Sequence, residues 1–444
     1  MGSLQPVLTQ YGELIAARHD ASEPAWLQAL RADAQQRLAS RGLPGKHLES
    51  WHYSAANLWL QEFAERHGVA PTEADATTPF AGALPAGHTL HFSHGRLIEQ
   101  RFDAEAAAQI ELLPLARLDE TRHAELRDWL RSRTAGPDSL ADLADALAPE
   151  AWLLVIKAGA RVAQPIVISQ TTSRAGSHIG QLLVWMQPDS EATLVDCFSA
   201  TASAGEYLGI SHQLLKLERG SRLTYARLHR EAASGQYLGV VEATVGRDAQ
   251  LRLQALASAP LNASTEAQRT RLRNGFYIRL EETGAEVIGR GAFAAAGQQH
   301  IDYHFTVDHR GDHGRSDILM QGLANGKSRG VVNGRIYIAA NTRANDGHFT
   351  SHNLLLSADA EIDAKPELEI YADEVSCAHG ATVGQLDKEQ LLYLQTRGID
   401  RPAAITLLTE GFLKAGLLDW SESALSDFFQ RQLLAALQES GGNR

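Results

Sequence analysis

The sequence predicts a mainly β protein in which a stacked parallel β-helix lies between two helical regions. Short aliphatic runs bounded by Gly, Asp, Asn and Ser, which are typical of strands, fill the middle of the chain. A turn residue followed by a small, a polar and an aliphatic residue recurs there, mostly at intervals of about 26–36 residues. Helix-period patterns occupy both ends of the 444-residue chain. A long β-sandwich whose turns share Gly and Asp is the alternative.

The first region, residues 1–150, is predicted to be mainly helical. Leucine and tryptophan recur at helical spacing over residues 24–38, and leucines do so again over residues 123–147. Gly136 and Pro137 interrupt the second stretch, which therefore predicts two helices rather than one.

The second region, residues 151–385, is the predicted β-helix. Its recurring pattern starts at Gly159, Glu191, Gly220, Asp248, Gly284, Asn333 and Asp359. In a repeat architecture each unit buries its apolar face only against its neighbours. Because no helical pattern lies between the strand-like runs, a βαβ sheet is disfavoured and a β-helix is favoured.

The third region, residues 386–444, is predicted to be helical again. Asp387 with Gln390 resembles a capping box, and Pro402 suits the first turn of the next helix. A third helix is expected over residues 421–437. The region is rich in apolar residues for its size, which predicts a docking surface for another protein.

Composition narrows the classes of function. The net charge of −12, from 41 basic and 53 acidic residues, disfavours non-specific nucleic-acid binding, which needs a basic surface. The two cysteines, Cys197 and Cys377, cannot form a disulfide framework and indicate a reducing compartment. No secretory-signal pattern and no apolar run long enough to span a membrane is found, so we expect a cytoplasmic protein or a mature organellar form.

The sequence lacks the nucleotide-binding and hydrolase motifs of enzymes that act alone. Residues 322–328, Gly-Leu-Ala-Asn-Gly-Lys-Ser, have one residue too few between the glycines for a phosphate-binding P-loop, and we interpret them as a turn. No Gly-x-Ser-x-Gly elbow and no His-Glu-x-x-His pair is present. We therefore expect no catalytic residues and no nucleotide bound by this chain.

The strongest local chemistry is the run Cys377-Ala378-His379. A thiolate and an imidazole are both good ligands for iron and zinc. With one residue between them on a strand, the two side chains point to the same face. Two ligands do not complete a tetrahedral site, so the others must come from a distant segment or another subunit. The alternative is a buried cysteine beside a hydrogen-bonded histidine.

A second cluster places four histidines within fourteen residues, with aspartates between them. They are His300, His304, His309 and His313. On strands, the first two can share a face, whereas His309 has the opposite parity, so polar packing between strands is favoured over a metal site. His348 and His352 are weaker candidates, and Cys197 lies in an apolar strand, where a core role is expected.

The residues around the Cys-Ala-His run resemble the SufB/SufD family of scaffold subunits from the Suf iron–sulfur cluster assembly system. The similar segments are Ser351–Leu356, Lys365–Asp373 and Cys377–Leu386. Val307-Asp-His309 and the stretch from Leu43 to Tyr53 also resemble the family, so the similarity extends over nearly the whole chain. Within the family, the Cys-Ala-His-Gly-Ala-Thr run and the scarcity of cysteine favour the SufD branch over the cysteine-richer SufB branch.

The resemblance implies a right-handed parallel β-helix flanked by helical regions, and a non-catalytic scaffold for de novo iron–sulfur cluster assembly. His379 first, and Cys377 second, would hold a nascent cluster at the interface with a SufB-type paralogue, together with a cysteine of that partner. The C-terminal helices would dock a SufC-type ATPase, whose ATP-driven dimerisation would expose the interface. Whether a homodimer forms when the paralogue is missing stays open.

Two other functions remain as alternatives. The first is a β-helix enzyme acting on polysaccharide, with carboxylates along a groove supplied by Asp359, Asp363, Glu367 and Glu369, although no paired-carboxylate motif connects them. The second is a metal-storage or sensor protein that uses the histidines between His300 and His313.

Overall fold

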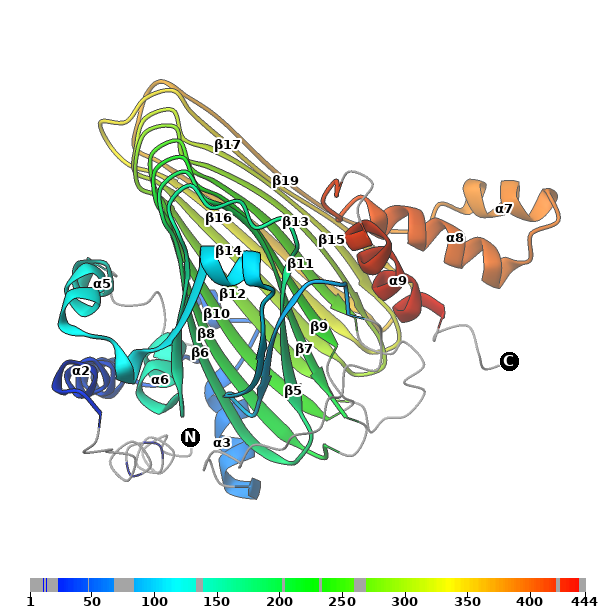
Figure 1. Ribbon diagram of the computed structural model, residues 1–444. Coiled ribbons are helices and arrows are strands. Elements are labelled where there is room, and N and C mark those ends of the chain that lie inside the picture. Colours follow the sequence, from blue (N-terminus) through cyan, green and yellow to red (C-terminus); the bar gives the residue numbers. More distant parts are fainter. Residues whose placement is uncertain are drawn as a thin grey trace.

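A parallel β-helix forms the body of the protein (Figure 1). The computed structural model describes residues 11, 13, 23–46, 48–67, 84–132, 139–201, 204–230, 234–258, 269–420 and 424–438. From residue 151 onward, successive strands alternate between two sheets, so that each turn of the solenoid adds one strand to each. The mainly β fold class with a parallel β-helix and helices at both ends is therefore confirmed, and the β-sandwich alternative is wrong.

The two sheets have the following order, with hydrogen-bonded neighbours adjacent. Sheet B runs β19 (Val375–Gln385), β17 (Asn345–Leu355), β15 (Arg315–Ala324), β13 (Glu286–Ala295), β11 (Gln250–Ser258), β9 (Arg222–Arg230), β7 (Glu191–Ala200), β5 (Ile166–Thr172), β1 (His88–Ser93) and β2 (Arg96–Arg101). Sheet A runs β18 (Glu361–Ile370), β16 (Arg329–Ile338), β14 (His300–His309), β12 (Arg271–Leu280), β10 (Gly235–Val245), β8 (Tyr207–Leu217), β6 (Gly176–Met186), β4 (Ala151–Ile156) and β3 (Ile110–Pro114).

The recurring turn residues stack one coil on the next. Gly220 and Gly284 have φ of 67° and 72°, the left-handed region that favours glycine. A Cβ on Gly220 would lie 2.3 Å from a carboxylate oxygen of Asp189, and a Cβ on Gly284 would lie 2.3 Å from one of Asp248. Each glycine therefore fits against the aspartate of the preceding coil, which explains the period seen in the sequence.

The inside of the β-helix, its lumen, is filled by one face of every strand. Parallel pairing in register places like residues above one another, as with Phe276 and Phe305, whose rings stack 4.8 Å apart. Residues 322–328, which have P-loop-like glycines, form the end of β15 and the turn that leads to β16, so their interpretation as a turn is confirmed.

The two ends of the solenoid differ. At the beginning, β2 pairs antiparallel with β1 and β3 pairs antiparallel with β4, so antiparallel strands form the first edge of both sheets, and β2 presents the charged residues Arg96, Glu99 and Arg101. At the other end, β18 and β19 are the last strands that the described residues place in each sheet. Their outer backbone edges are left without a neighbouring strand.

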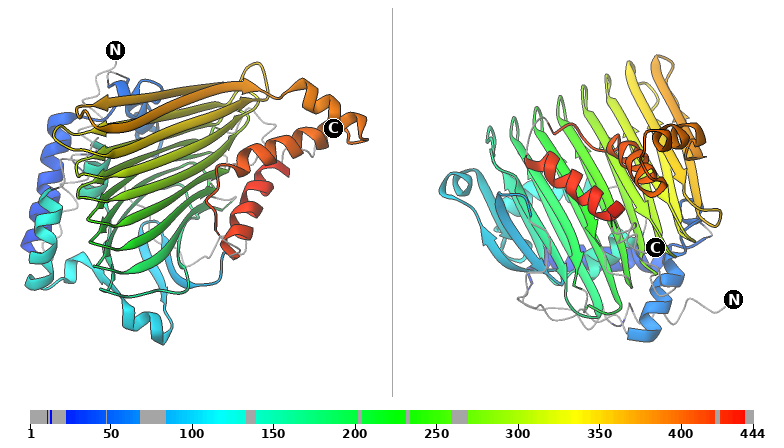
Figure 2. Two further views of the ribbon diagram at one scale, coloured as in Figure 1. Left: turned by 90° about the horizontal axis from the view of Figure 1, so that it is seen from above. Right: turned by 90° about the vertical axis from the view of Figure 1, so that its right-hand side faces the viewer.

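Helices from the first 150 residues cover the outer face of sheet A (Figure 2). They are α2 (Ala25–Arg41), α3 (Ala56–His67), α5 (Glu120–Ser132) and α6 (Ser139–Leu147), with short 3₁₀ turns at Glu49–Trp51 and Leu115–Arg117. The short helix α4 (Ala104–Gln109) instead packs Ala106 into the lumenal core at the beginning of the solenoid. This part of the chain also contributes β1, β2 and β3. The break expected at Gly136 and Pro137 lies outside the described residues, between α5 and α6.

The C-terminal helices lie on the opposite side, where α9 and the end of α8 pack against sheet B and α7 extends away from it (Figure 2). They are α7 (Lys388–Thr396), α8 (Arg401–Lys414) and α9 (Ala424–Gln438). Asp387 caps α7 and Pro402 occupies the first turn of α8, as the sequence predicts. The structure adds Asp400 as the cap of α8. None of the helices in the described part of the chain combines the length and apolarity needed to cross a lipid bilayer.

Candidate functional site at the open end of the solenoid

Cys377 and His379 both lie on β19, the last strand of sheet B. In the parallel register with β17, Cys377 is opposite Gly347 and His379 is opposite Phe349. Phe349 belongs to the lumenal core and is 1% exposed. The two candidate ligands therefore share the lumenal face of the strand, which is the arrangement that the period of two predicts.

The two side chains differ in exposure because nothing in the described chain stacks above β19. Cys377 is half-buried and packs against the lumenal core, whereas His379 is exposed. Burial raises the pKa of the Cys377 thiol, and the nearby Asp346 carboxylate acts in the same direction. In the isolated chain the thiol is therefore protonated at neutral pH, while the imidazole of His379 is exposed to solvent at the end of the solenoid.

An apolar rim surrounds this pair. On β18 the lumenal face continues through Ala364, Pro366, Leu368 and Ile370, in register with the buried lumenal residues of β16. Ile370 is 40% exposed, and Val383 on β19 is 46% exposed. We call this end, formed by β18 and β19, the open mouth of the lumen. Exposed apolar side chains beside two unpaired strand edges are the features of a surface that another chain covers.

The described chain supplies no further ligand that would complete a metal site around the two candidate residues. Among the described residues, no group of three or more His, Cys, Asp or Glu side chains could hold a metal ion. His348 and His352 point to the other face of sheet B, where His348 pairs with Asp346 at 2.7 Å and His352 bonds with Thr382 at 3.0 Å. The structure thus brings Cys377 and His379 together and leaves these two histidines apart from them.

The histidines between residues 300 and 313 do not converge. His300 lies 2.8 Å from Ser54 Oγ, and burial lowers the pKa of its imidazole to about 4. His309 lies 2.9 Å from Ser316 Oγ in the protein interior, and His313 is exposed in a turn. Polar packing is therefore the role that the structure gives to this cluster.

His300 and His304 belong to a polar network that anchors the N-terminal region to sheet A. Arg273 and Asp302 form a fully buried ion pair of 2.6 Å on the outer face of sheet A, and His304 lies 2.9 Å from the same carboxylate. The hydroxyl of Ser54 donates to Asp302, and the Arg273 guanidinium lies 3.5 Å from the centre of the Trp51 ring. This network fastens residues 49–54 to the β-helix.

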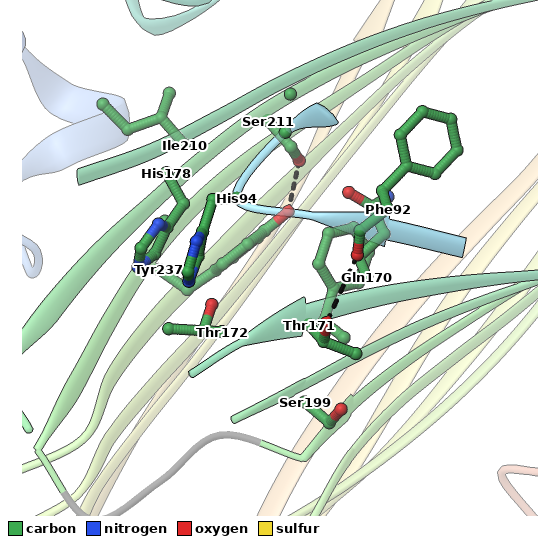
Figure 3. A pocket seen from close by; sticks show the side chains of 14 residues that line it. Phe92, His94, Gln170, Thr171, Thr172, His178, Ser199, Ile210, Ser211 and Tyr237 are labelled. Carbon is green, nitrogen blue, oxygen red and sulfur yellow. Dashed lines mark hydrogen bonds between the residues drawn. The ribbon is translucent and has the colours of Figure 1, made fainter. Parts of the chain in front are cut away.

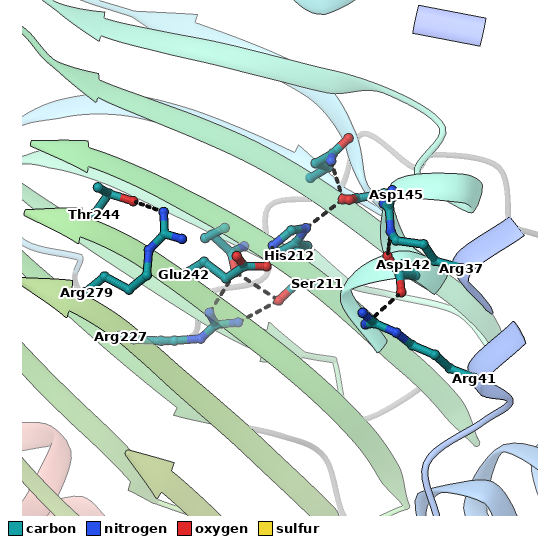
Figure 4. Close-up of polar contacts among 12 residues, drawn as sticks. Arg37, Arg41, Asp142, Asp145, Ser211, His212, Arg227, Glu242, Thr244 and Arg279 are labelled. Carbon is teal, nitrogen blue, oxygen red and sulfur yellow. Dashed lines mark hydrogen bonds and ion pairs between the residues drawn. The ribbon is translucent and has the colours of Figure 1, made fainter. Parts of the chain in front are cut away.

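A second polar network fastens α6 and α2 to the same sheet (Figure 4). His212 on β8 lies between two carboxylates, 2.6 Å from Asp145 on α6 and 3.0 Å from Glu242 on β10. Arg37 on α2 donates to Asp142 at 2.6 Å. These contacts are buried or half-buried ties between layers, and Glu242 also lines a cavity of about 390 Å³ together with Tyr277 and Arg279.

The lumen contains a buried arginine that the sequence analysis missed. Arg227, 1% exposed, donates to Gln213 at 2.7 Å, to Ser211 and Tyr237 at 2.6 Å each, and to His229 at 3.1 Å. The sequence contained one indication of it: within the apolar run of β9, Arg227 occupies one of the alternate positions whose side chains point into the lumen. Because four hydrogen bonds satisfy the guanidinium, its role is structural.

A small cavity lies beside this network (Figure 3). It is lined in part by His94, His178, Ser211 and Tyr237, and its volume of about 30 Å³ suits guests of the size of water. Burial, with the stacked His94 ring in support, lowers the pKa of His178 to about 3. The His178 ring therefore packs as a neutral group at physiological pH.

Three of the four carboxylates proposed for a polysaccharide-active enzyme are engaged in ion pairs, and the fourth, Asp359, lies exposed in the turn before β18. Asp363 pairs with Arg329 at 2.6 Å, and Glu369 forms two hydrogen bonds of 2.8 Å with Arg335. Glu367 pairs with Lys365 at 2.7 Å. These residues form an outward-facing ladder of ion pairs on β16 and β18, so the geometry provides no acid and base facing one bond.

The fold and the site define a β-solenoid protein with two candidate metal ligands, Cys377 and His379, at its open end. The chain belongs to the family described as SUF system FeS cluster assembly, SufBD core domain, whose family model matches residues 168–412.

Similar proteins support this membership. The chain is 26% identical to the iron–sulfur cluster assembly protein SufD of Escherichia coli, over 98% of each chain. It is 23% identical to an iron–sulfur cluster assembly SufBD family protein of Synechocystis over 88% of this chain and 87% of the relative. It is also 27% identical to a SufBD family protein of Mycobacterium tuberculosis over 59% of this chain and 65% of that relative.

Proposed function

We propose that this chain is a SufD-type scaffold subunit that builds an iron–sulfur cluster together with a SufB-type paralogue and a SufC-type ATPase. The observation that carries the proposal is the open mouth, where Cys377 and His379 occupy the lumenal face of an unpaired edge strand. The full-length similarity to the E. coli assembly protein agrees with it. The chain itself has no catalytic role in this proposal, nucleotide binding belongs to the ATPase, and the complex is cytoplasmic.

The paralogue covers the open mouth. Unpaired edges of β18 and β19 offer backbone donors and acceptors to strands of a second solenoid, and exposed side chains such as Ile370 and Val383 offer apolar area. His379 is the first ligand to the nascent cluster because its imidazole is exposed at this surface. Cys377 is the second, since its thiol must lose a proton before it binds iron, and a metal ion promotes that loss. The paralogue supplies the remaining ligands.

The ATPase docks on α7 and α8. Leu392 and Tyr393 on α7 are 62% and 58% exposed, and Leu407 on α8 is 50% exposed. A groove of about 500 Å³ lies next to them, lined by residues that include Leu356, Leu391 and Ile405. Large apolar side chains exposed on short helices beside a groove are a surface for protein association rather than for solvent.

The test is anaerobic reconstitution of the complex of this chain with SufB-type and SufC-type partners, from iron and sulfide. We expect His379→Ala to lower the cluster yield several-fold while the three proteins still co-purify. His352→Ala is the matched control, because His352 lies on β17 of the same sheet but faces the other side. Equal yields for wild type and His379→Ala remove His379 from the site. Failure of the wild-type proteins to co-purify would overturn the scaffold function itself.

A further inference from the structure

The C-terminal helices are attached to the β-helix at two separate places. At the first, β19 ends at Gln385 and α7 begins at Lys388, so the helical arm continues directly from the strand that carries Cys377 and His379. At the second, residues 415–420, which we call the connector, follow α8 and lie on the outer face of sheet B. Between these places, α7 and much of α8 extend away from the body (Figure 2).

The connector is held by one buried glutamine. Gln254 on β11 is 0% exposed, and its side chain points outward from sheet B. Its Oε1 accepts from the backbone N–H of Leu418 at 2.6 Å, and its Nε2 donates to the carbonyl of Gly416 at 3.0 Å and to that of Arg290 at 3.2 Å. Both ends of the amide are therefore used to fix the connector backbone to the sheet.

Close backbone contact adds a second restraint. A Cβ on Gly416 would lie 2.3 Å from the carbonyl oxygen of Gly291 on β13, a distance that real Cβ atoms do not reach. The connector therefore rests directly on the strand, and only glycine fits at position 416 without a shift. Gly411 in α8 provides a contrast, because a Cβ there would meet nothing within 4 Å.

Apolar packing holds the chain on both sides of the connector. Leu413 at the end of α8, and Phe428 and Phe429 on α9, are completely buried against sheet B. The ring of Trp420 stacks on Phe429 at 5.0 Å. In contrast, α7 exposes Leu392 and Tyr393, and it packs on α8 rather than on the sheets. The arm is thus fixed at the connector and less restrained at α7.

We propose that the connector is a fulcrum: a movement that a partner imposes on α7 and α8 is resisted at Gln254 and Gly416 and is delivered to β19 at the open mouth. If the connector were loose, α7, α8 and α9 would move together and the strand would feel little force. The identity of the partner as an ATPase depends on the proposed function, but the attachment of the connector does not.

The chain contains its own reporter for this attachment. Cys197 on β7 is 0% exposed and belongs to the apolar cluster beneath the C-terminal helices. In the Cys377→Ser background it is the only thiol, because the sequence has two cysteines. We expect Gly416→Ala and Gln254→Leu to accelerate the reaction of Cys197 with Ellman's reagent at least tenfold, and to accelerate amide hydrogen exchange at Leu418. Gly411→Ala is expected to leave both rates unchanged.

Gln254→Leu removes the three hydrogen bonds without a backbone clash, so it keeps the test informative if Gly416→Ala does not fold. Thiol and amide rates equal to wild type in Gln254→Leu, in a chain with the wild-type circular dichroism spectrum, would overturn the fulcrum.

The complex provides the second measurement, the ATP-dependent change in the rate at which maleimide modifies Cys377. In Gly416→Ala and Gln254→Leu we expect ATPase binding as in wild type and a several-fold smaller ATP-dependent change. A full change in both variants overturns the inference, whereas an absence of ATPase binding in wild type overturns the proposed function and leaves the thiol test on the isolated chain to decide the attachment.

Discussion

Replacing Asp302 by asparagine should destabilise the protein strongly although the side chain keeps its shape. Asp302 is 0% exposed, and its carboxylate accepts from Arg273 at 2.6 Å and from His304 at 2.9 Å. Burial alone would raise the pKa of Asp302, but the charges of Arg273 and His304 hold it well below its usual range. The carboxylate is therefore ionised in the folded protein at neutral pH.

The magnitude follows from what remains after the substitution. Asp302→Asn leaves the Arg273 guanidinium buried without its counter-charge, and breaking a buried pair in this way costs about 3–5 kcal/mol. The matched control is Asp317→Asn, which removes an ion pair of similar length, 2.7 Å to Arg290, in which the Asp317 side chain is 40% exposed. Solvent screens such a pair, so we expect a loss of about 0–1 kcal/mol there.

Urea unfolding followed by circular dichroism measures both variants, and hydrogen exchange over residues 49–54 shows where the loss occurs. Because Arg273 lies over Trp51 and Ser54 donates to Asp302, exchange in this segment should rise in Asp302→Asn and stay unchanged in Asp317→Asn. A loss below 1 kcal/mol in Asp302→Asn, or equal losses in the two variants, would refute the reasoning.

Two further predictions concern the core and acid stability. Gly334→Ala should lower the free energy of unfolding in urea by about 1–3 kcal/mol, because its Cβ would lie 2.2 Å from the Phe349 ring. Gly380→Ala is the control and should be close to neutral, because its Cβ would meet nothing within 4 Å. Equal effects of the two substitutions would contradict this. His300 has a folded-state pKa of about 4 against 6.5 when unfolded, so unfolding takes up a proton between these values and stability should fall as pH decreases from 6.5 to 4. The wild type should lose up to about 3 kcal/mol more than His300→Gln over this window, and parallel pH profiles would disprove the assignment.

The repeat and the parity of side chains made much of the fold predictable. Turn residues such as Gly220 and Gly284 recur because each must fit against the coil before it, and that constraint is local and visible as a period. The shared face of Cys377 and His379 follows from strand geometry alone, so it was predictable once the segment was interpreted as a strand. Capping of α7 by Asp387 and of α8 by Asp400 is equally local.

The remaining features depend on distant segments and could not be predicted. Arg227 is satisfied by residues of two neighbouring strands of the other sheet, which only the register between coils brings within reach. The role of Gln254 becomes visible only in the folded chain, where the connector, more than 160 positions later in the sequence, lies on it. Similarly, His300 and His304 have spacings that suit a ligand, but the arrival of Trp51 and Ser54 over sheet A makes them part of an anchor.

The unequal ends of the solenoid limit how the protein can associate. A stack of coils with two bare ends could add copies of itself head to tail without a stop, and such growth gives fibres. Here antiparallel strands, β2 and β3, form one end, and the exposed charges on β2 disfavour a further strand there, so elongation is favoured from the other end. A second solenoid protected in the same manner would terminate the assembly at two members, joined through the strands that carry the candidate ligands.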